Sequence, residues 1–278
     1  MTGGPNYADA DVGSLAKLLA PLTSDSSRAA VLCDVDGTLA PIVDRPDEAR
    51  VPADVSRLLG ALSRRYACVA CVTGRPALEA RRLVGEAGIA YAGLHGTEML
   101  YPGQERPRPL PSFEHWRGVV QGFAAVHSGP LRALGILVED KGPIAAFHWR
   151  GVPDEEAALA QLRRVSDNAE AAGLSARWGR MVLEVWPPVP GGKGLAVAEL
   201  IGASGARAAL FGGDDATDLD AFSTLDQLVA ERRLDAAVRV GVRSEEAPPG
   251  IVARADVVVD GTDGFRRVLD RLLGVAGC

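Results

Sequence analysis

The sequence predicts an α/β protein whose parallel sheet is interrupted by an inserted α+β segment. Near-continuous apolar strands alternate with helical patterns in the first third of the chain, and this alternation returns toward the C-terminus. Such strands are typical of a parallel sheet that helices cover on both faces. Between the two stretches, a helix followed by a hairpin occurs twice. This antiparallel pattern indicates an insertion within the first fold.

The first stretch begins after a leader, residues 1–27, which holds one short helical pattern at 15–19 and a Ser-rich run. We expect this leader to be mobile or loosely docked. From residue 28 onward, apolar runs predict strands and amphipathic runs predict helices. In order, these are a strand at 28–33, a helix at 52–65, a strand at 67–73, a helix at 76–88 and a strand at 89–94.

The inserted segment is predicted over residues 111–187, so that 28–110 and 188–278 form one core. Both crossings between these parts are Pro-rich, which suggests a hinge. The insertion is expected to hold helices at 113–128 and 154–172, each followed by two strands, around Lys141-Gly142-Pro143 and around Trp178-Gly179-Arg180. Parallel signals resume with a helix at 193–201, strands at 208–211, 237–242 and 256–259, and an acidic loop at 213–220.

The composition is that of a globular protein and disfavours nucleic-acid and membrane partners. The chain has 278 residues, with 30 Lys and Arg against 36 Asp and Glu, for a net charge of −6. A phosphate backbone would therefore receive little long-range attraction. No apolar run approaches the ~20 residues that span a bilayer, and the N-terminus lacks the basic and apolar regions of a signal peptide. We expect a cytoplasmic protein.

Cys68 and Cys71 form a C-x-x-C pattern, which in other contexts binds zinc or performs redox chemistry. The surrounding residues have strand composition, and residues three apart on a strand point to opposite faces. The sequence has no second Cys pair or neighbouring His that would complete four zinc ligands. We therefore interpret these cysteines as small buried hydrophobic residues.

Two acidic residues, Asp34 and Asp36, follow the first predicted strand in the run Asp-Val-Asp-Gly-Thr-Leu. In an open parallel sheet, ligands collect outside the carboxyl ends of the strands. Residues i and i+2 of a strand share a face, so the two carboxylates repel each other and call for a cation. An oxygen-rich site of this kind suits a hard ion, and Mg²⁺ fits best.

A second acidic cluster, which includes Asp214, Asp215, Asp218 and Asp220, follows a later strand and could converge on the same metal. The second strand ends at a hydroxyl in Val-Thr-Gly-Arg, and a lysine opens a helix after Gly-Gly. Hydroxyls, ammonium groups and backbone N–H groups of Gly-flanked turns are donors suited to phosphate oxygens. The residues concerned are Thr73 and Lys193.

Taken in this order, the four elements resemble the haloacid-dehalogenase superfamily of phosphohydrolases. A narrower resemblance is to the trehalose-6-phosphate phosphatase family. It is carried by Asp-Val-Asp-Gly-Thr-Leu-Ala-Pro-Ile (34–42), Gly-Leu-His-Gly-Thr-Glu (93–98), Val-Glu-Asp-Lys-Gly with His-Trp-Arg (138–150) and Gly-Asp-Asp-Ala-Thr-Asp-Leu-Asp-Ala-Phe (213–222). The resemblance implies a Rossmann-like core and an inserted cap with two helix-plus-hairpin units, which is where the α+β segment falls.

The resemblance implies a mechanism as well. Asp34 would be the nucleophile that forms an aspartyl phosphate, and Asp36 would act first as acid and then as base. Mg²⁺ would be held by a carboxylate oxygen of Asp34, the backbone carbonyl of Asp36 and Asp214. Asp215 and Asp218 would lie next to these ligands without binding the metal. Thr73 and Lys193 would stabilise the phosphoryl group during transfer.

The implied substrate contacts are of two kinds. Backbone amides near Gly37 and Gly74 would bind the phosphoryl group. In the cap, the resemblance implies sugar contacts from Glu139, Lys141 and Glu184; Arg75, His95 and Arg150 are further candidates. The implied substrate is trehalose 6-phosphate, with a functional link to a trehalose-phosphate synthase, and we expect a monomer. The chain departs from the family pattern at Leu219, where an acid is usual.

Other interpretations remain open at this point. The same chemistry could serve another sugar phosphate, such as sucrose phosphate or a mannosyl phosphoglycerate. A phospho-accepting receiver domain shares clustered acids, a hydroxyl and a lysine, and a catalytically inactive binding module is a further alternative. Among single residues, Asp218 and Asp220 could cap a helix, His95 could be structural, and the tryptophans at 149, 178 and 186 are better suited to a core or platform than to sugar stacking.

Overall fold

The computed structural model describes residues 12–43, 48–179, 181–189, 191–244 and 248–274. These residues form two compact units. The core unit comprises the residues up to Arg108 together with those from Gly191 onward, and the inserted unit comprises Pro109–Pro190. The sequence predicts the boundaries at 110/111 and 187/188.

The core unit contains an eight-stranded sheet in the order β12-β11-β10-β1-β2-β3-β4-β5. All pairs from β12 to β3 are parallel, and β3 pairs with β4 antiparallel. Cys33 at the end of β1 lies between Gly212 of β10 and Cys71 of β2. The carboxyl ends of these three strands therefore meet at one edge. The strands are β1 (Ala29–Cys33), β2 (Cys68–Val72), β3 (Ala90–Gly93), β4 (Glu98–Leu100), β5 (Arg108–Pro109), β10 (Ala208–Gly213), β11 (Ala236–Arg243) and β12 (Val257–Asp260).

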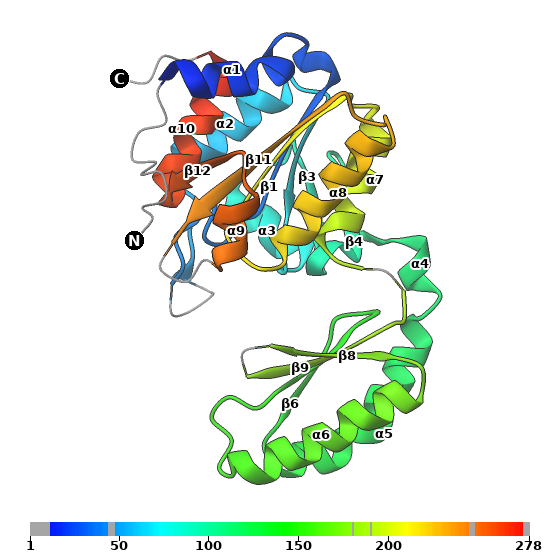
Figure 1. The fold of residues 1–278 in the computed structure, drawn as a ribbon. Helices are drawn as coiled ribbons and strands as arrows, with labels where there is room; N and C mark the ends of the chain where they lie inside the picture. The colour runs from blue at the N-terminus through cyan, green and yellow to red at the C-terminus, as the bar shows by residue number, and fades with distance from the viewer. Residues whose placement is uncertain (1–11, 44–47, 180, 190, 245–247, 275–278) are drawn as a thin grey trace. The chain divides into compact units, whose positions relative to one another are not determined.

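Helices cover both faces of this sheet, as the apolar strands predict (Figure 1). One face packs against α1, α2 and α10 through a cluster that includes Val31, Leu59 and Leu269. On the other face, Phe211 of β10 meets Phe222 of α8 edge to face, with ring centroids 6.2 Å apart. The helices of this unit are α1 (Val12–Thr23), α2 (Ala53–Ser63), α3 (Ala77–Val84), α7 (Lys193–Ser204), α8 (Asp218–Ala230), α9 (Pro249–Arg254) and α10 (Gly261–Leu273).

Helix α1 corrects the expectation of a loosely docked leader. Leu19 and Leu22 are 1% and 0% exposed and belong to the core cluster, and Leu15 and Leu18 pack against it. Their spacing places all four on one helical face. The predicted helix covered only 15–19, which is too short to show that face. Residues 1–11 lie outside the described part of the chain.

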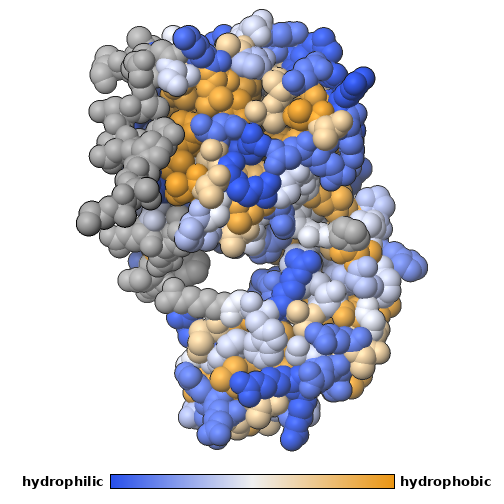
Figure 2. Space-filling view, viewed as in Figure 1, coloured by the Kyte–Doolittle hydropathy of each residue, from blue (hydrophilic) through white to orange (hydrophobic). Residues whose placement is uncertain are grey.

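The inserted unit contains a four-stranded antiparallel sheet in the order β6-β7-β9-β8. Helices α5 and α6 lie on one face of this sheet (Figure 1), where they bury Phe147, Leu183 and Val185. Hydrophilic side chains cover most of this unit on the side shown in Figure 2. Its elements are α4 (Pro111–Glu114), α5 (Arg117–Ala133), β6 (Leu137–Asp140), β7 (Ala145–His148), α6 (Glu155–Ala171), β8 (Ser175–Gly179) and β9 (Val182–Trp186).

The structure supports the structural interpretation of the cysteines. Cys33, Cys68 and Cys71 are free thiols, and burial raises the pKa of Cys68 to about 12. A thiol of that kind stays protonated and is a poor nucleophile and metal ligand. Within the described ranges, three side chains lie close enough together to hold a metal ion, and all three are aspartates. None of the helices in these ranges is both long and apolar enough to cross a membrane.

Candidate active site

The candidate active site lies at the carboxyl ends of β1, β2 and β10, where an open parallel sheet binds its ligands. Asp34 follows β1, Thr73 follows β2 and Asp214 follows β10. Lys193 is the first residue of α7. Segments up to 180 residues apart in sequence are thus brought together by strand order alone.

Lys193 is the electrostatic centre of the site. Its side chain is 1% exposed, and its Nζ lies 3.0 Å from Asp34 Oδ1, 2.7 Å from Asp218 Oδ1 and 3.8 Å from Asp215 Oδ1. Burial lowers the pKa of Lys193, but the neighbouring acids outweigh burial and raise this pKa above its ordinary value. Lys193 is therefore a fixed positive charge beside the Asp34 carboxylate.

The buried position of Lys193 depends on two glycines beside it. Gly192 has a φ of +140° and precedes the helix, while a Cβ at Gly194 would lie 2.3 Å from the Thr224 hydroxyl of α8. Only glycine permits α7 to approach α8 this closely. The close approach brings the first residue of α7 against the acidic loop that begins α8.

Asp218 and Asp215 hold the acidic loop in shape. Asp218 Oδ2 accepts hydrogen bonds from the backbone N–H groups of Asp214 and Asp215, at 2.9 and 3.0 Å. Asp215 Oδ1 accepts from the N–H and the hydroxyl of Thr217, at 2.7 and 2.6 Å, and from the N–H of Asp218. Asp215 thus satisfies N–H groups at the start of α8. Asp218 was expected as a possible helix cap, but its side chain instead satisfies N–H groups of the loop before α8.

The donor set fits a divalent metal ion. Asp34, Asp214 and Asp218 each offer a carboxylate oxygen, and these atoms lie within 4.8 Å of one another in a buried site. Burial and mutual repulsion raise the pKa of Asp214 to about 7 and that of Asp218 to about 6, and burial raises the pKa of Asp34 as well. Buried acids that repel one another in this way call for a cation. Oxygen ligands alone suit Mg²⁺.

Gly37 and Thr38 fix Asp214 from the opposite side. Gly37 has a φ of +82°, and a Cβ at this position would lie only 2.1 Å from Asp214 Oδ2. The Thr38 hydroxyl donates a hydrogen bond of 3.1 Å to Asp214 Oδ1. The Gly-Thr pair after Asp36 therefore leaves room for Asp214 and orients it. Thr38 stands in the Asp-Gly-Thr motif, but the sequence alone predicts no role for it.

Asp36 is paired with Arg75. The Nε and Nη2 atoms of Arg75 donate to the two carboxylate oxygens of Asp36, at 2.7 and 2.8 Å, and Arg75 also pairs with Glu79 one helical turn later. This fork-to-fork geometry holds the Asp36 carboxylate in one plane. Arg75 was expected as a substrate contact, and the structure places it on the predicted acid–base residue.

Thr73, Gly74 and His95 form a second turn beside the site. Thr73 is 1% exposed and its hydroxyl accepts a hydrogen bond from the N–H of Arg75. A Cβ at Gly74 would lie 2.7 Å from the His95 ring, so glycine permits the two segments to touch. His95 itself has a φ of +55°, a left-handed conformation that is uncommon outside glycine.

In the inserted unit, the structure brings three of the predicted sugar contacts together. Lys141 Nζ lies 2.9 Å from Glu184 Oε1 and 3.8 Å from Glu139 Oε2. All three side chains belong to the sheet face opposite α5 and α6, because Glu139 and Glu184 both pair with Ala146 of β7. His148, for which the sequence alone predicts no role, joins them: its Nε2 lies 2.9 Å from Glu139 Oε2. Arg150 lies in the exposed turn after β7.

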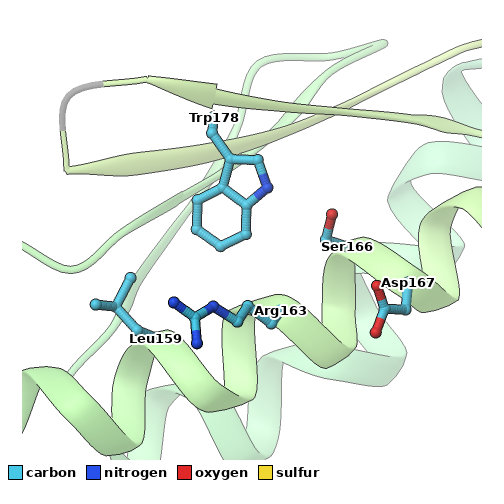
Figure 3. A pocket seen from close by; sticks show the side chains of 5 residues that line it. All are labelled: Leu159, Arg163, Ser166, Asp167 and Trp178. Atoms are coloured by element: carbon cyan, nitrogen blue, oxygen red, sulfur yellow. The ribbon is translucent and has the colours of Figure 1, made fainter.

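Trp178 lies on the helix side of this sheet. It forms a pocket of about 310 Å³ with Leu159, Arg163, Ser166 and Asp167 of α6 (Figure 3). Its ring also meets Trp149 edge to face at 5.7 Å, and Trp149 is part of the buried core of the unit. The face that carries Glu139, Lys141 and Glu184 is therefore not the one on which Trp178 lies.

Leu219, the departure from the family pattern, contacts a neighbouring helix. Its side chain is half-buried, and its Cδ1 lies 3.0 Å from the Cβ that a residue other than glycine would have at 250, in α9. Leu219 thus packs against α9, while Asp218 beside it carries the contacts to Lys193.

A buried aspartate beside a buried lysine, at the strand ends of this fold and opposite a second acidic loop, is the arrangement that the resemblance to the haloacid-dehalogenase superfamily implies. A solved haloacid dehalogenase-like hydrolase from Bacteroides thetaiotaomicron has the same fold, with a TM-score of 0.61 over 88% of this chain and 99% of that one, at 13% identity. The trehalose-phosphatase family model matches residues 32–247, and the chain belongs to this family.

Two further similarities agree with this family. A probable trehalose-phosphate phosphatase of Sinorhizobium fredii is 33% identical over 213 residues, which is 76% of this chain and 78% of that protein. A solved trehalose-6-phosphate phosphatase related protein has a TM-score of 0.66 at 25% identity and covers 88% of this chain and 98% of that one. Other curated relatives are longer, and the match spans between 15% and 59% of their lengths.

Proposed function

We propose that this chain hydrolyses trehalose 6-phosphate to trehalose and phosphate through a phosphorylated Asp34, with Mg²⁺ as cofactor. The observation that carries the proposal is the contact of 3.0 Å between the buried Asp34 carboxylate and the buried Lys193 ammonium, beside the acids of the second loop. The substrate is taken from relatives that are named trehalose-phosphate phosphatases.

In the first step, a carboxylate oxygen of Asp34 attacks the phosphorus, and the bond from phosphorus to the sugar oxygen breaks as the new bond forms. Asp36 gives its proton to the departing sugar oxygen. Arg75 orients the Asp36 carboxyl by its paired hydrogen bonds. Lys193, Thr73 and the amides near Gly37 and Gly74 stabilise the charge on the transferring phosphoryl group.

In the second step, Asp36 takes a proton from the water that attacks phosphorus, and the bond to Asp34 breaks to release phosphate. Mg²⁺ would be held by Asp34, Asp214 and the backbone carbonyl of Asp36, and when bound it neutralises the charge shared by carboxylates and phosphate. Asp215 and Asp218 hold the loop and Lys193 in place.

We propose that Glu139, Lys141 and Glu184 of the inserted unit contact the sugar hydroxyls, with Arg150 of the same unit and His95 of the core unit as further candidates. A cluster of opposite charges on one sheet face offers both acceptors and donors, which an uncharged disaccharide requires. An isolated phosphate ester without sugar makes no use of these groups.

The test is phosphate release from a panel of sugar phosphates with Mg²⁺, with EDTA, and with Asp34→Asn. We expect selective hydrolysis of trehalose 6-phosphate that requires the metal and is absent in Asp34→Asn. Faster turnover of another sugar phosphate would support the same reaction mechanism but show that trehalose 6-phosphate is not the preferred substrate. A stable phospho-protein without turnover would instead favour a receiver domain.

A further inference from the structure

Glu184 is held at both carboxylate oxygens by different partners. Lys141 Nζ donates to Oε1 at 2.9 Å, and the indole Nε1 of Trp186 donates to Oε2 at 3.1 Å. Two donors on the two oxygens fix the rotation of the carboxylate plane, whereas one donor would leave it free to turn. Lys141 was anticipated from the sequence, but Trp186 was expected only as a core or platform residue.

The strand geometry explains why Trp186 reaches this carboxylate. Glu184 and Trp186 are two residues apart on β9, so their side chains leave the same face of the sheet. Val185 between them points to the other face, where it joins the core under α5 and α6. The indole N–H is therefore aimed along the sheet surface at its neighbour, as a buried tryptophan requires a hydrogen-bond acceptor.

The Trp186 ring is itself fixed in position. It is 1% exposed, and the guanidinium carbon of Arg177 lies 4.1 Å from the ring centroid. Arg177 comes from β8 and is the register partner of Glu184. A cation over the face of an indole is an attractive contact. Substrate cannot reach a ring with so little exposed surface, so any effect of Trp186 on substrate passes through Glu184.

We infer that Trp186 is a positioning residue for sugar recognition: its indole N–H, together with Lys141, pre-orients the Glu184 carboxylate for the sugar hydroxyls. The inference rests on the proposed function, in which Glu184 contacts the disaccharide. Ordering a free side chain on binding reduces affinity. A carboxylate that is already fixed avoids that loss, and specificity for the disaccharide then depends on a residue that does not touch it.

The experiment compares Trp186→Phe, which keeps an aromatic ring and removes the N–H, with Trp178→Phe, the matched change on the opposite face of the same sheet. Both are assayed with trehalose 6-phosphate and with p-nitrophenyl phosphate, which has no sugar. We expect Trp186→Phe to raise KM for trehalose 6-phosphate about 3- to 10-fold. Its kcat, and both constants for p-nitrophenyl phosphate, should stay within about twofold, and Trp178→Phe should match the wild type.

A double-mutant cycle with Glu184→Ala separates positioning from a general structural role. If Trp186 acts through Glu184, Trp186→Phe has no further effect on KM in the Glu184→Ala background. Additive effects, an unchanged KM in Trp186→Phe, or equal losses with both substrates would each overturn the inference. An unchanged KM in Glu184→Ala, or a wild type that does not hydrolyse trehalose 6-phosphate, would instead overturn the proposed function on which it rests.

A second measurement covers the case in which Trp186→Phe does not fold. The chain has four tryptophans and thus four indole N–H signals in an NMR spectrum of labelled protein. Glu184→Ala removes the acceptor of one of them, so one indole signal should shift strongly while the other three stay near their positions. Four unshifted indole signals would show that the hydrogen bond is absent in solution and would overturn the inference.

Discussion

Gly37→Ala tests the active-site geometry most directly, because the structure gives both the displacement that this substitution causes and a control substitution, Gly103→Ala, that lacks it. A Cβ at Gly37 would lie 2.1 Å from Asp214 Oδ2, and ordinary contact begins at 3.4 Å. The Asp214 carboxylate or the loop must therefore move by about 1.3 Å. A displacement of about 1 Å at reacting groups can reduce the rate about 10²-fold.

The backbone contributes a separate, smaller effect. Gly37 has a φ of +82°, where a residue with a Cβ costs about 1–2 kcal/mol. Gly103 has nearly the same φ, +80°, but nothing lies within 4 Å of its Cβ position. Gly103→Ala therefore carries the backbone cost without the collision, and each kcal/mol lowers Tm by about 2–4 °C in a protein of this size.

The assay is phosphate release across a Mg²⁺ titration, with a thermal melt of each variant. We expect both variants to melt a few degrees lower, with Gly37→Ala alone losing about 10²-fold in kcat/KM and requiring more Mg²⁺. Activity of Gly37→Ala within threefold of the wild type would refute the reasoning, and so would an equal loss of activity in Gly103→Ala.

Three further predictions concern Lys193, Asp214 and helix α1. Lys193→Met leaves Asp34 and Asp218 buried without their cation, so we expect a loss of about 3–5 kcal/mol in the free energy of unfolding, measured by urea denaturation, and no detectable phosphate release; an active Lys193→Met would contradict the role of this lysine. The raised pKa of Asp214, about 7, means that the metal-free native state binds a proton which the unfolded chain releases near pH 4. In EDTA, the free energy of unfolding should therefore fall as pH rises from about 4 to 7. Because the proton and Mg²⁺ compete for Asp214, adding Mg²⁺ should raise Tm more at pH 8 than at pH 5.5. A gain in Tm that does not depend on pH would exclude this competition. Leu19→Ala should lower the free energy of unfolding by about 2–5 kcal/mol if α1 is part of the core. An unchanged Tm would instead support a loosely docked leader.

The fold class and the convergence of the candidate site residues could be predicted because both depend on short local patterns. Apolar strands that end in Asp34, Thr73 and Asp214 place these residues at one edge of a parallel sheet. The family assignment is confirmed by the match over residues 32–247. Local pattern was enough here because each motif stands immediately after a strand.

Other features depend on contacts that no local pattern records. The burial of Lys193 requires α7 to pack closely on α8, which depends on Gly194 meeting Thr224. Arg75 was assigned to substrate because the sequence does not show that it reaches Asp36, 39 residues away. Strands β4 and β5, with three and two residues, are too short to show an alternating pattern.

The division of the chain has a consequence for how such proteins diversify. Asp34, Asp36, Lys193 and Asp214 all lie outside Pro109–Pro190, while that single continuous segment has a hydrophobic core of its own. A recombination event with two breakpoints could exchange the whole segment and leave these four residues of the candidate active site untouched. New substrates could then be acquired without changes to the residues of the candidate active site.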